Sequence, residues 1–187
     1  TKRLGLLRLV PRGLTVVDVG AGSGYLLPEL AEAGARVIAV DQVPRQLEKA
    51  RRRAAELGLA NVEFREGDFG ALPVADREAD AAFLHLALHH APDPTAVLAD
   101  VFRALRPGGN TVVTEFMAHD QSWLRDEHAD LWLGFDPEEL AAMMSGAGFT
   151  DLQHERRPFV RDEVRERSGP ASDLEVFVIS GRKPLQP

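Results

Sequence analysis

The sequence predicts an α/β fold, a doubly wound sheet of seven mostly parallel strands with helices on both faces. Three observations predict it. Short apolar strands alternate with amphipathic helices, a glycine-rich turn follows the first strand, and an acidic residue lies at or just beyond the end of each of the first three strands. Alternating strands and helices form parallel sheets, and such sheets bind ligands beyond the carboxyl ends of their strands.

The expected strands are short runs, of which the first is β-branched and the fifth is rich in threonine and valine. The seven runs are 16–19, 36–40, 62–65, 80–84, 111–116, 150–155 and 175–180. The expected helices cover 25–33, 46–57, 95–105 and 137–146, and they carry apolar residues at helical spacing. Gly34 and Gly58 close the first two helices, and Asp136 is placed to cap the amino end of the last.

With 187 residues the chain suits one domain, 1–187, which is long enough to bury a core. Within it we expect a lead-in segment at 1–14, a substrate-side insertion at 118–135 and a mobile loop at 158–173. The first strand follows soon after Thr1, so an additional N-terminal domain in the natural protein is left open.

Composition argues against several classes of function. No apolar run approaches the roughly 20 residues that span a bilayer, so we expect no membrane segment. The absence of cysteine excludes disulfides and thiolate metal sites and favours a cytoplasmic location. The net charge of −7 argues against nucleic acid as a partner of this domain. The arginines at 51–53 do not change this, because Glu48 and Glu56 lie at neighbouring helical turns.

The glycine-rich turn at 20–24 follows the sequence V-V-D-V. Glycines at alternate positions let the backbone turn tightly and approach a ligand closely. A dinucleotide-binding G-x-G-x-x-G loop needs a third glycine where this chain has Tyr25, and a phosphate-binding P-loop needs a lysine that is absent nearby. The turn therefore predicts a ligand of another class.

The acidic residues indicate which class. Asp18, directly before the turn, would repel a pyrophosphate but attract a positive charge. Asp41 ends the second strand, where an acid accepts hydrogen bonds from ribose hydroxyls. Asp68 and Phe69 follow the third strand and suit an adenine, with a carboxylate for its amine and a ring for its face. The alternative for Phe69 is packing in the core. Together the three acids predict a cationic nucleoside without phosphates.

This ordered set resembles the motifs of class I S-adenosylmethionine-dependent methyltransferases, a family with a Rossmann-like fold. The matching residues are Asp18-x-Gly20-x-Gly22-x-Gly24, Asp41, Gly67-Asp68 and Leu105-Arg106-Pro107-Gly108-Gly109. The resemblance implies S-adenosylmethionine as cofactor, S-adenosylhomocysteine as product, and an antiparallel last strand at 175–180. Carried over residue by residue, it implies a cofactor-binding set of Asp18, Gly20, Ala21, Gly22, Ser23, Gly24, Asp41, Gln42, Gly67, Asp68, Phe69 and His85.

Three histidines follow the fourth strand. His89 and His90 are the candidate catalytic residues, because an imidazole can act as a base near neutral pH. The alternative is that they only bond to nearby backbone. A metal site built on His85 and His89 would need a helix and a further ligand, whereas a strand-to-loop transition is expected here, so the sequence predicts no metal.

An aromatic stretch follows the fifth strand. Residues 117–125 and 130–135, together with the Leu-His-His run at 88–90, resemble methyltransferase domains fused behind ArsR-type winged-helix repressors. The chain is similar as well to small-molecule methyltransferases of the ubiquinone and menaquinone type. Trp123, Trp132 and Phe135 are candidates for the roof of the substrate site or for core packing. Arsenite methylation is not expected, because it needs thiolates and the chain has no cysteine.

Two functions from different classes remain. The first is an enzyme that methylates a small-molecule acceptor, and the second is a sensor that binds the cofactor or its product without turnover. A nicotinamide oxidoreductase fits the fold but not Asp18 or Tyr25. Methyl transfer depends mainly on in-line positioning, so the lack of an obvious acid and base pair does not count against an enzyme. A homodimer is left open.

Overall fold

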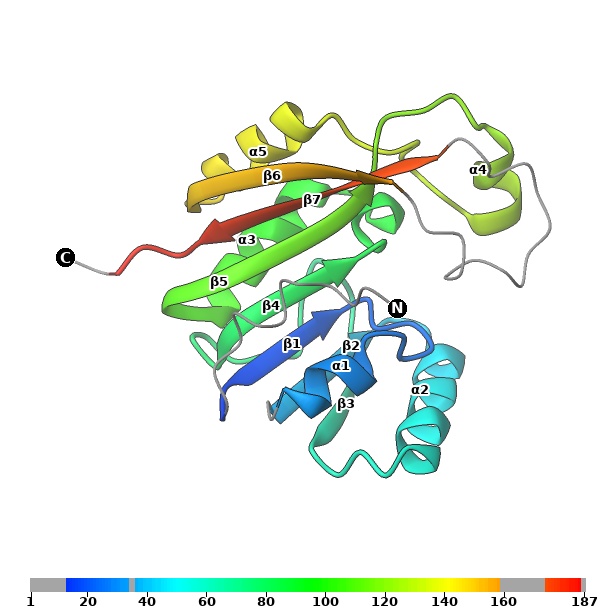
Figure 1. Ribbon diagram of the computed structural model, residues 1–187, viewed down its shortest axis with the longest axis vertical. Coiled ribbons are helices and arrows are strands. Elements are labelled where there is room, and N and C mark those ends of the chain that lie inside the picture. The colour runs from blue at the N-terminus through cyan, green and yellow to red at the C-terminus, as the bar shows by residue number, and fades with distance from the viewer. Residues whose placement is uncertain (1–12, 34–35, 159–173, 186–187) are drawn as a thin grey trace.

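The computed structural model describes residues 13–33, 36–158 and 174–185, and its strands form one seven-stranded sheet (Figure 1). The strand order is β3-β2-β1-β4-β5-β7-β6. The strands are β1 (Thr15–Val19), β2 (Arg36–Asp41), β3 (Val62–Glu66), β4 (Ala79–His85), β5 (Leu105–Phe116), β6 (Thr150–Pro158) and β7 (Glu175–Arg182). The first five run parallel, and β7 pairs antiparallel with both β5 and β6. The predicted sheet and its antiparallel last strand are confirmed.

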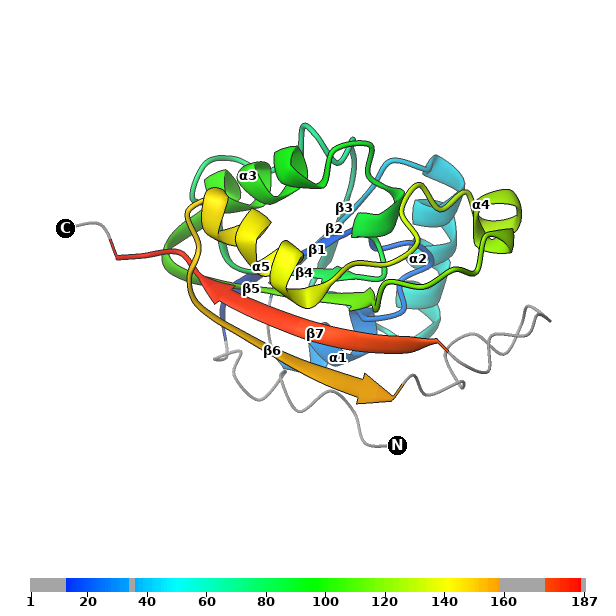
Figure 2. The same cartoon turned by 90° about the horizontal axis from the view of Figure 1, so that it is seen from above.

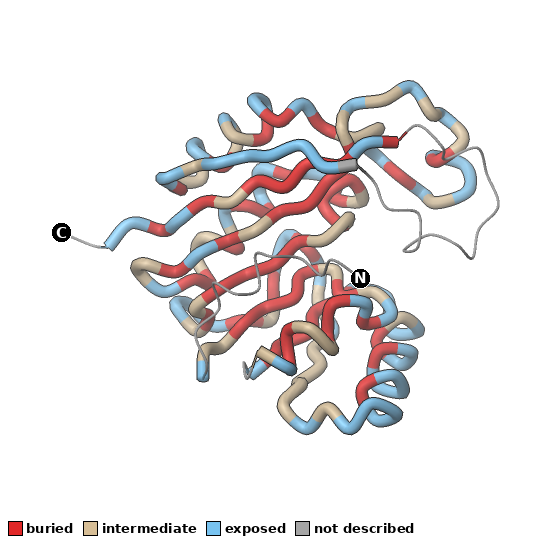
Figure 3. Tube along the Cα trace, in the orientation of Figure 1, coloured by how far each residue is buried: buried red, intermediate tan, exposed pale blue. Residues whose placement is uncertain are grey.

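Helices cover both faces of the sheet because alternate strand residues point to opposite sides. Val17 and Val19 pack with α3 (Pro94–Ala104) and α5 (Pro137–Gly146), whereas Val16 packs with α1 (Leu27–Glu32) and α2 (Pro44–Glu56). Figure 2 shows α3 and α5 on one side and α1 on the other. The central strands are therefore buried on both faces, as the continuous buried runs in Figure 3 show.

Aspartates set the starts of two helices. Asp93 accepts the N–H groups of Thr95 and Ala96 at 3.0 and 3.1 Å, and Asp136 accepts those of Glu138 and Glu139 at 2.9 and 3.3 Å. In each case a proline follows, whose missing N–H would have no partner in the first helical turn. The cap predicted at Asp136 is confirmed.

The predicted start of the first helix is wrong, and two short elements were not predicted. The first helix begins at Leu27 rather than at residue 25, because Pro28 has no N–H to bond to an earlier turn. The helix α4 (Trp123–His128) and the short 3-10 turn η2 (Leu88–His90) were not expected. In α4 only Leu124 is buried, so the segment lacks the regular spacing of apolar residues from which a helix is predicted. Gly34 and most of the loop expected at 158–173 lie outside the described residues.

The fifth strand starts earlier than expected. β5 begins at Leu105, directly after α3, whereas the fifth strand was expected only at 111–116. Backbone bonds explain the difference: Gly108 donates to Lys183 and Lys183 donates to Gly109, both at 2.8 Å. Ala79 of β4 pairs with Leu105 and Ala81 pairs with Asn110, so a shift of register between these two pairs accommodates the additional residues of β5.

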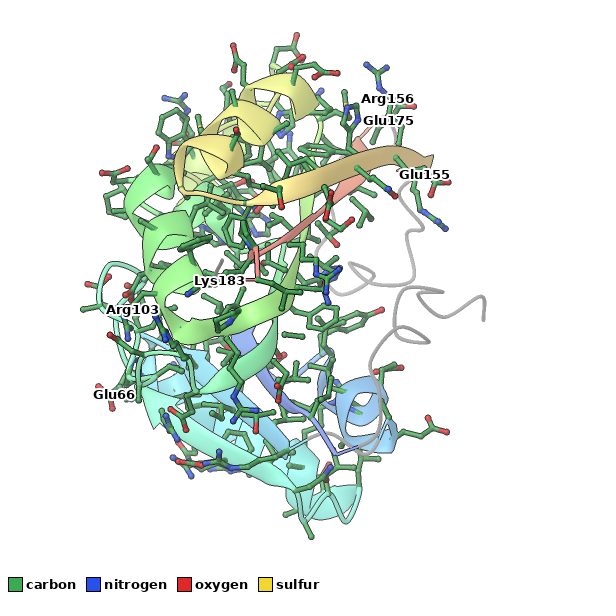
Figure 4. The ribbon with its side chains drawn as sticks, turned by 90° about the vertical axis from the view of Figure 1, so that its left-hand side faces the viewer. Glu66, Arg103, Glu155, Arg156, Glu175 and Lys183 are labelled. Atoms are coloured by element: carbon green, nitrogen blue, oxygen red, sulfur yellow. The ribbon has the colours of Figure 1, made fainter. Side chains whose placement is uncertain are left out.

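Lys183 joins the last strand to α3 (Figure 4). Its buried ammonium donates to the carbonyls of Phe102 and Leu105 at 2.6 and 2.8 Å, and it lies 4.5 Å from the centre of the Phe102 ring. These carbonyls close the carboxyl end of α3, where a cation is favourable. Burial lowers the pKa of Lys183.

Charged side chains are exposed on the edge strand of the sheet and on α2. On the edge strand β6, Glu155, Arg156 and Arg157 are exposed (Figure 3), which discourages pairing with another sheet. On α2, Arg52 pairs with Glu48 as expected. None of the described helices is long and apolar enough to cross a membrane.

Gly134→Ala is expected to lower the free energy of unfolding by about 2–4 kcal/mol. Gly134 has φ +74°, and an added Cβ would lie 2.3 Å from the carbonyl oxygen of Met117, which the backbone holds in place. Urea denaturation measures the effect. Gly146→Ala at the end of α5 is the matched control, because its Cβ would meet nothing within 4 Å. That change should raise stability by up to about 1 kcal/mol, and a Gly134→Ala protein as stable as the parent would contradict the prediction.

Candidate functional site

The predicted cofactor residues lie at the carboxyl ends of four adjacent strands. β1 lies between β2 and β4, and β2 pairs with β3. The segments that follow these parallel strands therefore meet beyond their carboxyl ends, on one side of the molecule (Figure 1). In a doubly wound sheet this is where ligands bind.

The glycine turn is held by the neighbouring strand. The N–H groups of Gly20 and Ala21 both donate to the carbonyl of Val40 at 2.9 Å, and Gly24 donates to Ala21 at 2.9 Å. Gly20, Gly22 and Gly24 all have positive φ, between +53° and +82°. A Cβ on Gly20 would lie 2.6 Å from the Cβ of Ala87. The glycines are therefore required by conformation and, at Gly20, by close packing.

Gly22 faces open space. A Cβ built there would meet no other atom closer than the Gly20 carbonyl oxygen, 4.0 Å away. The next residue, Ser23, is exposed. The turn thus leaves room for a ligand above Gly22.

Asp18 is buried directly beneath this turn. Its side chain is 2% exposed, and its Oδ2 has no hydrogen-bond partner among the described residues. Burial, and secondly the charge of Asp41, raise the pKa of Asp18 from 3.8 to about 7. A carboxyl in this state is costly to ionise until a cation or donor reaches it.

Asp41 connects the turn to β2. Its Oδ2 accepts the N–H of Gly22 and its Oδ1 accepts the N–H of Val43, each at 2.8 Å. Each oxygen keeps a second lone pair for a further donor. The adjacent Gln42 side chain is exposed.

The segment 67–69, which follows β3, contacts both Asp41 and the glycine turn. Gly67 donates to the carbonyl of Asp41 at 3.2 Å, and Asp68 is exposed and accepts the N–H of Gly70 at 3.1 Å. Phe69 is buried, with ring carbons 3.1 and 3.3 Å from the position of a Cβ on Gly20. The ring thus packs under the glycine turn, within the main hydrophobic cluster.

His85 lies at the end of β4 and is half-buried. Its ring stacks on that of Tyr25, with centroids 5.5 Å apart and planes 12° apart. Tyr25 is the residue that departs from a dinucleotide-binding loop, and here it packs over the end of the fourth strand. The structure therefore brings the turn and His85 to one place.

His89 is buried between two carboxylates. Its Nδ1 lies 2.7 Å from Glu115 Oε2, and its Nε2 lies 3.7 Å from Asp130 Oδ1. Burial opposes the charged form, but the charge of Glu115, the hydrogen bond to it and the charge of Asp130 outweigh burial and raise the pKa of His89. His90 is half-exposed, with Nδ1 3.6 Å from the same Asp130 oxygen. Burial and the nearby charge of His89 lower the pKa of His90.

Glu115 binds the backbone of the η2 turn that carries His89. Its side chain is 0% exposed and accepts the N–H groups of Leu88, His89 and Phe116 at 2.8, 3.3 and 3.3 Å. Sequence reasoning missed Glu115 and Asp130. A carboxylate inside the apolar strand at 111–116 was the available signal for Glu115, because buried acids are rare without partners. Asp130 had no such signal.

The aromatic residues of the 118–135 segment take different positions. Trp132 is partly exposed, donates from Nε1 to the carbonyl of Ala91 at 2.9 Å, and stacks on Phe135 at 5.8 Å. Phe135 is buried in the core, so for this residue the packing alternative holds. Trp123 donates to Gln121 at 3.0 Å.

A cavity of about 570 Å³ lies away from this site, beside the amino end of β4 and the start of β5. Asp80, Arg106 and Arg182 are among its lining residues, and Arg106 pairs with Asp80 at 2.8 Å. None of the predicted cofactor or catalytic residues lines it.

Comparison with known proteins adds an independent result. Residues 11–145 match a family model described as a methyltransferase domain. Arsenite methyltransferase of Halobacterium salinarum is 32% identical over 142 residues, covering 74% of this chain and 34% of the relative. The chloroplastic 2-methyl-6-phytyl-1,4-hydroquinone methyltransferase 1 of Oryza sativa is 33% identical over 151 residues, covering 79% and 44%. This chain thus spans less than half the length of either relative. The crystal structure of a SAM dependent methyltransferase from Aquifex aeolicus superposes with a TM-score of 0.72 at 20% identity, covering 92% of this chain and 84% of that one.

Proposed function

Because this chain belongs to the class I S-adenosylmethionine-dependent methyltransferase family, we propose that it transfers the cofactor's methyl group to a small-molecule acceptor. When bound, the cofactor would supply a methyl group from its sulfonium sulfur to an oxygen, nitrogen or carbon of the acceptor, with S-adenosylhomocysteine as the leaving product and the acceptor's proton passing to a base or to solvent. Two relatives are named for small acceptors, arsenite and a hydroquinone, which supports a small acceptor here.

The observation that carries the proposal is the buried, unpartnered carboxylate oxygen of Asp18. A buried polar atom without a hydrogen bond costs free energy that a suitable ligand recovers. The α-ammonium group of S-adenosylmethionine supplies both donors and positive charge, whereas the pyrophosphate of a dinucleotide supplies neither. The space above Gly22 accommodates the methionine portion, which we assign to the turn at 20–24.

We assign the nucleoside to the next two strand ends. The free lone pairs of Asp41 accept the ribose hydroxyls, with Gln42 beside them. Gly67, Asp68 and Phe69 take the adenine, for which the exposed Asp68 carboxylate provides an acceptor. His85 borders the methionine portion from β4.

Catalysis is assigned to His89 and His90. Ala87 lies against Gly20, so the residues that follow it stand next to the glycine turn. An acceptor between these histidines and the methyl group would be held close and partly shielded from water. Such positioning supplies several kcal/mol of a methyl-transfer barrier.

Asp41→Ala is expected to weaken S-adenosylmethionine binding by about 100-fold, or about 3 kcal/mol, because the ribose loses a charged acceptor and the turn loses its bond to Gly22. Calorimetric titration measures the affinity. Asp76→Ala is the matched control, since Asp76 is an exposed carboxylate paired with Arg103 and should leave affinity unchanged. Undiminished affinity in Asp41→Ala would remove the ribose assignment.

Turnover separates an enzyme from a domain that only binds the cofactor. The parent protein is expected to release S-adenosylhomocysteine with at least one member of a panel of small phenols, amines and carbon acids. If the parent protein binds S-adenosylmethionine but forms no product with any acceptor class, the enzymatic part of the proposal is contradicted.

A further inference from the structure

The side chains of His89, His90 and Asp130 lie close together, and none of the three is assigned a role in cofactor binding. One nitrogen from each histidine and one carboxylate oxygen all lie within 4.8 Å of one another. We propose that these three residues bind a divalent transition-metal ion of the zinc type.

The distances from Asp130 to the two histidines suit a shared metal ion better than direct hydrogen bonds. Asp130 Oδ1 lies 3.7 Å from His89 Nε2 and 3.6 Å from His90 Nδ1, beyond hydrogen-bonding range. His90 Nδ1 also lies 3.5 Å from the carbonyl oxygen of Ala129, a contact that a bound ion would replace. Ligand atoms around a tetrahedral ion with bonds of about 2.1 Å lie roughly 3.4 Å apart. The two distances to Asp130 exceed this spacing by only a few tenths of an ångström, and the two histidine nitrogens lie within 4.8 Å of each other, so a modest contraction would be needed to complete the geometry.

Asp130 provides a second, independent observation. Its side chain is 2% exposed, and its Oδ1 has no hydrogen-bond partner in the described part of the chain. A buried carboxylate oxygen without a donor is costly. The same oxygen faces both histidines, so a cation between the three groups would satisfy it.

The surroundings hold the three groups in place. Glu115 lies 2.7 Å from His89 Nδ1, which leaves Nε2 of a neutral ring to face Asp130. Metal-binding histidines commonly have such a carboxylate on their other nitrogen. The backbone N–H groups of Leu131 and Trp132 both donate to the carbonyl of His89, at 3.0 and 3.1 Å. Asp130 is thereby held against His89 by its own backbone neighbours.

Charge balance also favours a cation. Glu115 and Asp130 are both buried, and no lysine or arginine forms an ion pair with either among the described residues. A divalent ion would balance both carboxylates while the imidazoles stay neutral. Two imidazoles and one carboxylate suit zinc, cobalt, nickel or iron rather than magnesium or calcium.

Three protein ligands leave a fourth position open, as in catalytic zinc sites. If the proposed function holds, an acceptor hydroxyl can occupy that position and lose its proton to solvent as its oxygen binds the ion. This role would replace a free histidine base. The sequence argued against a metal from His85 and His89. The proposed site instead combines adjacent histidines with an aspartate some forty residues later, a combination that helical spacing does not reveal.

The test is a Co²⁺ titration of the full chain, freed of any affinity tag and stripped with a chelator. We expect one equivalent to bind, with the strong visible absorption of four-coordinate Co²⁺, and Zn²⁺ to displace it. His90→Ala and Asp130→Asn should each weaken Co²⁺ binding by at least about 100-fold. His154→Ala is the matched control. His154 lies on the edge strand β6, where it pairs with Glu138 of α5, so this variant should bind Co²⁺ like the parent.

Absence of saturable one-to-one binding, or parent-like binding by His90→Ala, would overturn the metal site. His90 is half-exposed, so its variant should fold even if Asp130→Asn does not, and thermal unfolding checks this. S-adenosylmethionine titration of the same samples is read separately. Cofactor binding without Co²⁺ binding refutes only the metal site, whereas Co²⁺ binding without cofactor binding refutes only the proposed function.

Discussion

Asp18→Asn is expected to stabilise the cofactor-free protein at pH 8 by up to about 4 kcal/mol. A carboxyl whose pKa is raised by folding contributes stability that is complete below its unfolded pKa and is lost as pH rises through its folded pKa. For Asp18 the loss therefore spans pH 3.8 to about 7. At about 1.4 kcal/mol per pH unit, this interval corresponds to about 4 kcal/mol. Urea denaturation of both proteins at pH 5.5 and pH 8 measures the difference.

The same change should weaken S-adenosylmethionine binding at pH 8 by about 30- to 1,000-fold, because it removes one partner of a buried charge pair. Below pH 7 the parent must itself lose a proton to bind the cofactor, so the gap between parent and variant should narrow. Asp76→Asn, which changes an exposed carboxylate, should alter neither property. A variant less stable than the parent at pH 8 would show that Asp18 has a partner in the cofactor-free protein.

Glu115→Ala is expected to lower the free energy of unfolding by about 3–5 kcal/mol. The carboxylate accepts three backbone N–H groups and contacts His89 Nδ1, and all four would remain buried without an acceptor. Urea denaturation at constant pH measures the loss.

Two variants frame this result. Glu115→Gln keeps an oxygen for part of the cluster and should lose less stability than alanine, although its amide opposes one donor. Glu138→Ala removes an exposed carboxylate and should change stability by no more than about 0.5 kcal/mol. Equal stability of Glu115→Ala and the parent would mean that water replaces the carboxylate at no cost.

The cofactor side of the site was readable because its signals are local. Gly20, Gly22 and Gly24 lie within five residues of one another and supply the positive φ angles that the turn requires. Asp18 and Asp41 each lie at the end of an apolar run. The parallel sheet then brings these ends together without further information. The assignments themselves stay predictions until the titrations are done.

The acceptor side was not readable to the same extent. His89, Glu115 and Asp130 come from three separate segments, and their proximity depends on how the chain after β5 returns to η2. Such long-range contacts leave no period or spacing in the sequence. By contrast, the early start predicted for the first helix was avoidable, because Pro28 already excluded it. The relation to ArsR-fused domains stays a prediction.

The position of β7 has a consequence for biosynthesis. Although it follows β6 in the chain, β7 lies between β5 and β6 and pairs with both. Until this strand has left the ribosome, β5 has one unpaired side and β6 has no neighbour in the sheet. The half of the protein that carries Glu115 must therefore complete its folding after translation of the last strand, and nonsense truncations before residue 175 should yield aggregating chains.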